Sequence, residues 1–410
     1  MLKIAPLTRI PALASLQYRN YRLYWTGLLV AIIGYQVLTF TQLWLVYELT
    51  NSTVYTGLVG GVNGVTNIVL SLFGGVFADK LDRRKLLLIT QSFMALLACT
   101  LAVLTITKVV DVWHVLVIAG FTGATAAFDS PARQALIPHL IDDRKDLGNA
   151  VALGSSVWSA AGILGPAIAG TLIAATSPAI CFFVTSSGYI TMVLVLRSIH
   201  LNKPPANPAR LNILVEIKEG WGYVLHNRIF LVLIGMSYFS SMFGFSFMYL
   251  LPVFAKDILQ VGSSGYGFLS TATGIGSVCG AIVVASLSRR GHRGKLLITG
   301  CIVYGALLAV FGISRSYMFS LSVLAMTGLF NAIFLTNVMT SLQAFVPDGL
   351  RGRVMGIYSL TFSFMPLGGL WAGLMAKAVG APLTVAIGGS CISVFALVIL
   401  IFSKRIRQLN

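Results

Sequence analysis

The sequence predicts an all-α membrane protein in which twelve transmembrane helices form two six-helix bundles. Three observations predict this fold class: an apolar composition, long runs without charged residues, and short sequence motifs that recur in both halves of the chain. Hydrophobic residues make up 57% of the 410 residues and charged residues only 10%, whereas a soluble domain carries about 25% charged residues. So few charges could not cover the surface of a soluble body of this size. The composition therefore excludes a soluble enzyme, a disordered chain and a soluble secreted protein.

The predicted spans follow from stretches that lack Asp, Glu, Lys and Arg. A helix that crosses a membrane needs about 20 mainly apolar residues. Eleven charge-free runs meet this need: 23–47, 49–78, 86–107, 112–128, 147–196, 229–255, 258–288, 296–314, 316–347, 354–376 and 378–403. The run 147–196 is too long for one crossing, and Ser177-Pro178 offers a turn in its middle. The chain is therefore expected to cross twelve times, as helices, because only a helix satisfies its own backbone in lipid.

The basic residues predict the orientation of these spans. All but four of the 29 Lys and Arg residues fall in loops on one side of the predicted membrane; the exceptions are Lys108, Lys256, Arg315 and Lys377. Loops rich in Lys and Arg face the cytoplasm, so both termini are expected there. The net charge of +17 is then explained by topology and by anionic lipid, without a nucleic-acid partner.

A polar stretch near the middle divides the chain. Residues 202–208 (NKPPANP) cannot be helical throughout, because three prolines interrupt them. The following segment, 210–228, has apolar residues at helical spacing and is expected to lie as an amphipathic helix on the cytoplasmic interface. The predicted domains are a first bundle (1–200), a linker (201–227) and a second bundle (228–410).

The two halves repeat each other. The pentapeptide at 134–138 (QALIP) returns as QAFVP at 343–347, and the basic loop at 79–84 returns at 288–293. Both pairs are 209 residues apart. A parallel duplication related by a pseudo-twofold axis is typical of transporters whose two bundles rock about a central site.

The loop that closes the second span carries a candidate gate. Gly75 permits close helix approach, Asp79 is suited to cap a helix of the opposite half near Arg353, and Arg83 is expected to pair with Asp79 and with Asp129. The alternative is an ordinary cytoplasmic basic loop. The predicted gating residues are Gly75, Asp79, Lys80, Arg83, Arg84, Asp129, Arg133 and Arg353.

This loop resembles the signature of the major facilitator superfamily, with Asp82 where that family usually has Gly. Four stretches, 44–52, 73–79, 131–138 and 351–356, resemble the drug:proton antiporter branch that includes macrolide-efflux proteins and the enterobactin exporter. The resemblance implies a bacterial inner-membrane protein that works by alternating access. It does not name a substrate.

The segment 162–170 in the fifth span resembles the antiporter signature of that superfamily, through Gly162, Gly165, Pro166 and Gly170. Small residues permit tight helix packing, and proline kinks a helix. Simple packing is the alternative interpretation of this segment.

The fold implies a substrate site near the midplane, lined by spans 1, 4, 7 and 10. Aromatic, amide, hydroxyl and methionine side chains on these spans and on span 2 are the candidates: Tyr35, Gln36, Thr39, Phe40, Asn63, Asn67, Phe121, Thr125, Phe128, Tyr238, Met242, Phe245, Tyr249, Asn331, Phe334 and Asn337. The four candidates of span 7 would share one face of a continuous helix. Lipid contact or packing is the alternative for the aromatic and methionine residues.

No Asp, Glu, Lys or Arg is expected deep within a span, since Asp129 and Glu48 lie at span ends. A cavity of this kind suits a bulky amphipathic molecule, neutral or weakly charged, and argues against a highly anionic substrate. If protons drive transport, Asp129 and Glu48 are the candidate carboxylates. The alternative for Asp129 is a purely structural role as a partner of Arg83 or Arg133.

The predicted function is a monomeric secondary exporter of amphipathic small molecules, such as drugs, antibiotics or siderophore-like compounds. Its expected partners are the substrate, the bilayer and protons. A lipid or lysolipid flippase and a membrane sensor on the same fold are the alternatives. No catalytic residue, cofactor or metal site is predicted, because the sequence contains no His-Glu-x-x-His, Gly-x-Ser-x-Gly or Walker pattern.

Overall fold

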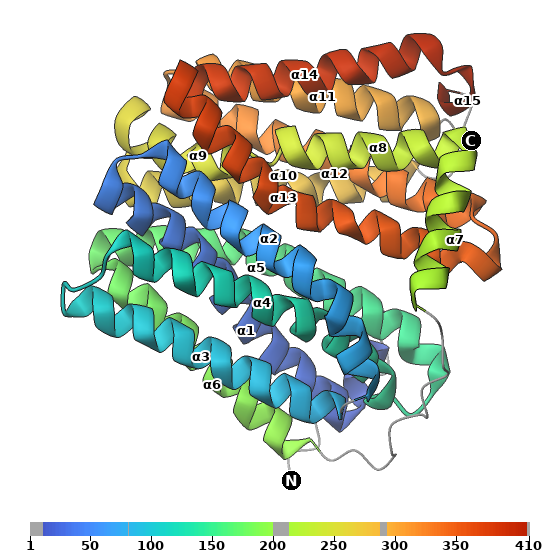
Figure 1. The fold of residues 1–410 in the computed structure, drawn as a ribbon, viewed down its shortest axis with the longest axis horizontal. Helices are drawn as coiled ribbons and strands as arrows, with labels where there is room; N and C mark the ends of the chain where they lie inside the picture. The colour runs from blue at the N-terminus through green and yellow to red at the C-terminus, as the bar shows by residue number, and fades with distance from the viewer. Residues whose placement is uncertain (1–10, 81, 200–212, 288–292, 408–410) are drawn as a thin grey trace. The chain divides into compact units, whose positions relative to one another are not determined.

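The computed structural model describes residues 11–80, 82–199, 213–287 and 293–407. Within these ranges the chain forms long α-helices joined by short turns (Figure 1). Eleven of the described helices are long and apolar enough to cross a membrane. The remaining predicted span falls on α2 (Thr53–Lys80), whose 28 residues are also sufficient for a crossing. The prediction of an all-α membrane protein is confirmed.

The helices pack as two compact units. Unit 1 contains the residues up to 42 and residues 65–209, and unit 2 contains residues 43–64 and the chain from 210 onward. The ends of α1 and α2 that residues 51–52 join therefore belong with the second half of the chain. The first half forms α1 (Arg19–Thr50), α2, α3 (Arg83–Ile106), α4 (Val112–Leu136), α5 (Leu147–Ala175) and α6 (Pro178–Ser198).

The second half repeats the helix order of the first. It forms α7 (Ile213–His226), α8 (Arg228–Phe243), α9 (Phe247–Val253), α10 (Gly262–Leu287), α11 (Arg293–Ile313), α12 (Tyr317–Phe345), α13 (Arg351–Val379), α14 (Ala381–Phe402) and the short α15 (Lys404–Arg407). In unit 1, α3 packs against α4 and α6; in unit 2, α11 packs against α12 and α14 (Figure 1). The third span of each half therefore contacts the fourth and sixth spans of that half, as a duplication requires.

Local sequence signals begin several of these helices. The Asp82 carboxylate accepts hydrogen bonds from the backbone N–H groups of Arg84 (2.9 Å) and Lys85 (3.2 Å), and so caps α3. Asp111 caps α4 in the same way, in a reciprocal capping box with His114. The aspartate that replaces the usual glycine of the basic loop thus has a structural role as a helix cap.

The seventh span is interrupted, contrary to the continuous helix expected from the sequence. Helix α8 ends at Phe243, α9 begins at Phe247, and a π-helical turn (Phe254–Ile258) follows. A Cβ atom built on Gly244 would lie 2.4 Å from the Tyr304 hydroxyl, so only glycine fits where the two helices meet. The four candidate residues of this span therefore do not lie along one continuous α-helix.

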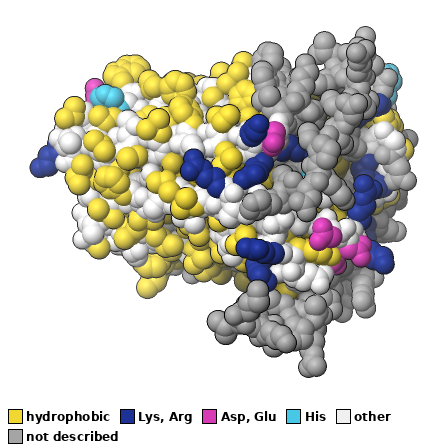
Figure 2. Space-filling model, turned by 90° about the horizontal axis from the view of Figure 1, so that it is seen from below, with side chains coloured by type: hydrophobic (Ala, Val, Ile, Leu, Met, Phe, Trp, Pro, Cys, Tyr) yellow, Lys and Arg dark blue, Asp and Glu magenta, His cyan; other side chains and the backbone are white. Residues whose placement is uncertain are grey.

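Large apolar side chains cover the outside of the described helices (Figure 2). On α3, Ile89 and Leu96 are 65% and 61% exposed, and they lie seven residues apart on one face. Lys and Arg side chains gather in a few places on the face drawn in Figure 2. Exposed apolar surface of this extent would cause a soluble protein to aggregate, whereas in a bilayer it faces lipid.

Candidate functional site

Unit 1 contains a cavity of about 520 Å³ between its own helices. Five helices and the turn after α4 contribute its walls. The residues that line it are Tyr24, Leu28, Ile32 and Tyr35 from α1, Gln91 and Met94 from α3, Thr125, Ala126, Asp129, Ser130, Arg133 and Gln134 from α4, Ile137 from the turn after α4, Val151, Gly154, Ser155 and Trp158 from α5, and Tyr189 from α6.

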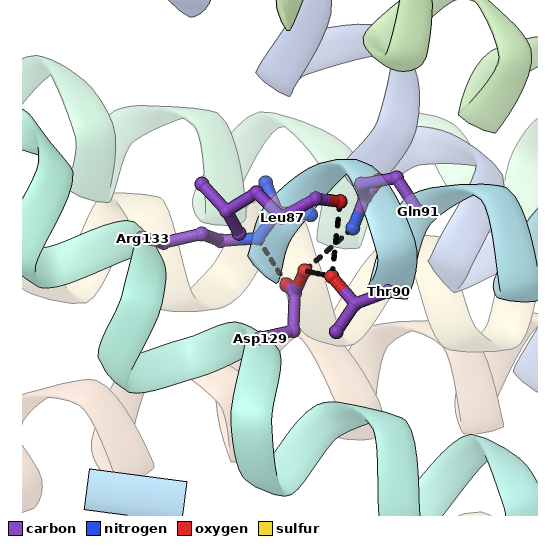
Figure 3. A network of polar contacts seen from close by, with 5 residues as sticks. All are labelled: Leu87, Thr90, Gln91, Asp129 and Arg133. Carbon is purple, nitrogen blue, oxygen red and sulfur yellow. Dashed lines mark hydrogen bonds and ion pairs between the residues drawn. The ribbon is translucent and has the colours of Figure 1, made fainter. Parts of the chain in front are cut away.

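A carboxylate lies at the centre of a polar network in this cavity (Figure 3). Asp129 forms an ion pair with Arg133, one turn later on α4. It also accepts hydrogen bonds from the Thr90 hydroxyl (2.8 Å) and from the Gln91 amide Nε2 (2.6 Å), both on α3. The network ties α3 to α4 through one acidic side chain and three donors.

Arg133 corrects an expectation from the sequence. It was expected in a cytoplasmic loop, but α4 continues through Pro131, and Arg133 lies in the last turn of the helix. Its side chain is only 11% exposed, because it turns into the cavity and pairs with Asp129. A buried cation therefore lies in the cavity, at the end of the fourth span and not deep within it.

Three polar atoms of the cavity residues have no hydrogen-bond partner among the described residues: Arg133 Nη1, Gln91 Oε1 and the Tyr189 hydroxyl. Gln91 and Tyr189 are 1% and 2% exposed. Because leaving such groups unpaired costs about 1–3 kcal/mol each, they identify the part of the cavity where a polar ligand would gain most.

The aromatic wall of the cavity includes one predicted residue. Tyr35 and Trp158 meet edge to face, with ring centroids 6.1 Å apart and planes at 74°. Thr125, also predicted, lines the same cavity. Phe121 does not: it is 48% exposed and packs against Phe93.

The other candidates of unit 1 lie outside the cavity lining. Gln36 packs against the glycines of α5, and the Thr39 hydroxyl bonds back to its own helix. The Asn67 amide donates to the Gly123 carbonyl of α4 over 3.3 Å. Phe40 is buried, and Phe128 is partly buried.

In unit 2 the predicted residues pack within the helices. Tyr238 donates to the Ile357 carbonyl over 2.6 Å, and the Tyr249 ring fills the space beside Gly60 and Gly369. Asn63, Met242 and Phe245 are partly buried. Asn331, Phe334 and Asn337 are 7%, 0% and 3% exposed, so all three contribute to the interior of this unit.

Two of the predicted gating arginines bind backbone carbonyls. Arg83 Nη1 lies 3.3 Å from the Ala135 carbonyl and 3.0 Å from a ring nitrogen of His139. The expected pairing of Arg83 with Asp129 is wrong, because Arg133 takes that position. Arg84 donates to the Leu196 (2.7 Å) and Arg197 (2.8 Å) carbonyls at the end of α6, and so acts as its C-terminal cap.

The remaining gating candidates are less fully placed. Gly75, Asp79 and Lys80 belong to α2 by their backbone, and the side chains of Asp79 and Lys80 lie outside the described part of the structure. Arg353 lies in the first turn of α13, and its Cβ packs against Gly220 of α7.

The antiporter-like segment forms the contact between α5 and α1. A Cβ atom built on Gly165 would lie 2.5 Å from Gln36 Cβ, whereas one on Gly162 would be 3.7 Å from the Gln36 amide nitrogen. Pro166 and Gly170 are buried in α5. Close approach at Gly165 thus positions the α1 segment that carries Tyr35.

Several residues of the cavity were missed from the sequence: Tyr24, Gln91, Trp158 and Tyr189. Gln91 could have been found, because an amide within an apolar span must face protein or water. The aromatic residues carried no such signal, since rings are common on all faces of membrane helices.

Comparison with known proteins gives the chain relatives over most of its length. It is 26% identical to the staphyloferrin A transporter of Staphylococcus aureus over 89% of this chain and 91% of that protein. It is 25% identical to the multidrug efflux pump Tap of Mycolicibacterium fortuitum (90% and 91%) and 24% identical to the enterobactin exporter EntS of Escherichia coli (88% and 86%).

The fold is also found in solved structures. A bacterial homologue of the human lysosomal transporter Spinster, in an inward-facing and unoccupied conformation, matches with a TM-score of 0.73 at 12% identity, over 95% of this chain and 96% of that one. The transmembrane secretion effector family (MFS_3) matches residues 10–410. These matches confirm the resemblance inferred from the sequence, and the chain belongs to the transmembrane secretion effector family of the major facilitator superfamily.

Proposed function

We propose that the protein exports amphipathic small molecules across a bacterial inner membrane by alternating access, without catalytic chemistry. The cavity of unit 1 is the observation that carries this proposal. It combines an aromatic wall at Tyr35 and Trp158 with a buried charged pair, Asp129 and Arg133. A relative named as a staphyloferrin A transporter supports transport of small molecules, and relatives named as a multidrug efflux pump and an enterobactin exporter support export as the direction.

Contacts within unit 2 are suited to close the outer side of the pathway. The Tyr47 hydroxyl donates to Asp257, and Lys256 Nζ donates to Asn51 over 2.7 Å. Trp44 stacks on Tyr266, with ring centroids 5.8 Å apart. These contacts join the loop end of α1 to segments of the second half of the chain. They would form while the site faces the cytoplasm and separate when it opens outward.

A second set of contacts, beside this gate, brings the backbones of α2 and α13 close together. A Cβ atom on Gly57 would lie 2.5 Å from the Gly369 carbonyl oxygen and 3.0 Å from Gly373 Cα. The Thr53 hydroxyl donates to the Gly373 carbonyl over 3.0 Å. Glycines that bring two backbones together permit a seam that can close tightly and release again.

Proton coupling is assigned to Asp129. It is a carboxylate that lines the cavity, and its partners on α3 and α4 would rearrange when it takes up a proton. Glu48, the other candidate, is exposed near the end of α1 and lines no described cavity. The distribution of the basic residues supports a cytoplasmic position for both termini, and the protein is proposed to act as a monomer in the bilayer.

Transport by purified protein in liposomes tests the function. The cargoes are a cationic dye, 3-hydroxy-2-naphthoate and a fluorescent lysophospholipid, each measured with and without an imposed pH gradient. We expect flux of at least one soluble cargo above that of protein-free liposomes, faster with the gradient. Translocation of the lysolipid alone would instead indicate a flippase. Absence of any flux by folded protein would favour the sensor alternative.

A further inference from the structure

The three unpartnered atoms of the cavity differ in what they can bind. Arg133 Nη1 is a charged donor, the Tyr189 hydroxyl can donate or accept, and Gln91 Oε1 can only accept. They come from α4, α6 and α3, and all three residues line the same cavity. One ligand that satisfied all three would need both an acceptor and a donor.

The guanidinium of Arg133 is only partly paired. Nε is used in the ion pair with Asp129, while Nη1 has no partner among the described residues. A guanidinium edge in a buried site preferentially binds an anionic oxygen, because charge-assisted hydrogen bonds are about twice as strong as neutral ones.

We propose that this cavity binds an organic anion that also carries a hydroxyl or N–H group. Its anionic oxygen is held by Arg133 Nη1 and the Tyr189 hydroxyl, and its own donor group by Gln91 Oε1. The apolar body of the ligand lies against Tyr35 and Trp158. This inference names the substrate class of the exporter and therefore rests on the proposed function. It replaces the expectation that the cavity disfavours anions.

Asp129 gives the proposal its sharpest consequence. Of the residues that line the cavity, Asp129 and Arg133 are the charged ones. The Asp129 carboxylate both occupies Arg133 and repels a second anion. Neutralising Asp129 must then strengthen binding of an anion, whereas a purely structural role of the pair predicts weaker binding.

The test uses the purified full-length protein in nanodiscs and calorimetric titration with three naphthalene probes. These are 3-hydroxy-2-naphthoate, neutral 2-naphthol and cationic 2-naphthylmethylammonium. In the unmodified protein we expect the hydroxynaphthoate to bind more tightly than either other probe. Arg133→Gln is expected to weaken its binding by about 10- to 100-fold, from the strength of charged hydrogen bonds. Asp129→Asn is expected to tighten it, and Tyr189→Phe to weaken it about threefold.

Controls separate binding from folding. Arg228→Gln removes an exposed arginine that begins α8, and it should leave hydroxynaphthoate binding unchanged. Arg133→Gln leaves Asp129 without its cation, so Arg133→Gln combined with Asp129→Asn is measured as well. The double variant restores a neutral pair and should still bind the anion weakly.

Two results would overturn the proposal. One is hydroxynaphthoate binding no tighter than 2-naphthol in the unmodified protein. The other is weaker binding in Asp129→Asn at an unchanged melting temperature. Flux in liposomes distinguishes this failure from failure of the proposed function. Export that is unchanged in Arg133→Gln would contradict only the proposed anion site. Anion binding without any flux would contradict only the proposed export function.

Discussion

The Tyr47 hydroxyl donates a hydrogen bond to the Asp257 carboxylate, and so connects the end of α1 to the π-helical turn that follows α9. If this contact belongs to the outer gate, Asp257→Asn should favour the open state. A hydrogen bond to a charged group contributes about 1.5–3 kcal/mol. Labelling of a single cysteine at Thr56, which is fully buried, should then accelerate about tenfold or more.

This labelling is measured with an impermeant thiol reagent after replacement of the five native cysteines. Lys256→Gln is the matched control, because the Lys256–Asn51 contact is exposed and contributes little. Equal acceleration in both variants, or in neither, would contradict the assignment of Asp257 to the gate.

The glycine seam predicts a position-specific effect of alanine. Gly57→Ala places a methyl group 2.5 Å from a backbone carbonyl that cannot move aside, at a cost of about 1–3 kcal/mol in the closed state. Gly61→Ala meets only the flexible Leu370 side chain, at 3.2 Å, and should be tolerated. Liposome transport rates and Thr56 labelling measure the difference. Identical behaviour of the two variants would show that the seam does not need to close.

The contact of α5 with α1 supports a similar pair. Gly165→Ala would drive a methyl group into Gln36 Cβ and displace the α1 segment that carries Tyr35. We expect a loss of about 1–3 kcal/mol in stability and weaker binding of naphthalene probes. Gly162→Ala, with 3.7 Å of space, is the control. Thermal unfolding and probe affinity would both be unchanged if α5 serves only as lipid-facing surface here.

Arg84 is predicted to stabilise the fold and not to gate transport. Arg84→Gln removes the donors to the Leu196 and Arg197 carbonyls and should lower stability by about 1–3 kcal/mol. The transport rate per folded molecule should stay the same. Lys85→Gln changes an exposed neighbouring charge and should alter stability by less than about 0.5 kcal/mol. A reduced transport rate at unchanged stability would contradict this prediction and support a gating role for Arg84.

The number and type of the helices could be predicted from the sequence, because each span must satisfy a length and a composition that lipid imposes. Arg133 could not be placed by counting charges, since that method assigns every arginine to a loop. The spacing of Asp129 and Arg133 did carry the signal for their pairing, because an acidic and a basic residue four apart can pair along a helix, and the structure shows this pair in place of Arg83 with Asp129.

The cavity itself was harder to predict. Tyr24, Gln91 and Tyr189 come from three helices, and their convergence depends on the packing of α1, α3 and α6. Neither the hydrophobic periodicity nor the spacing of residues along the sequence shows that these three side chains lie in one cavity. The substrate residues expected on span 7 were chosen by chemistry and by their spacing along one helical face, and the structure interrupts that helix. The structure places Tyr238 of this span, and the three candidates of span 10, among the packed helices of unit 2.

The break at Gly244 divides the seventh span into two helices that can bend relative to each other. A displacement of the Asp257 end can be accommodated by bending between α8 and α9, without separating α8 from α13. The Asp257 end of this span could then move while α8 keeps its packing against α13. Motion at one membrane face then need not strain the other.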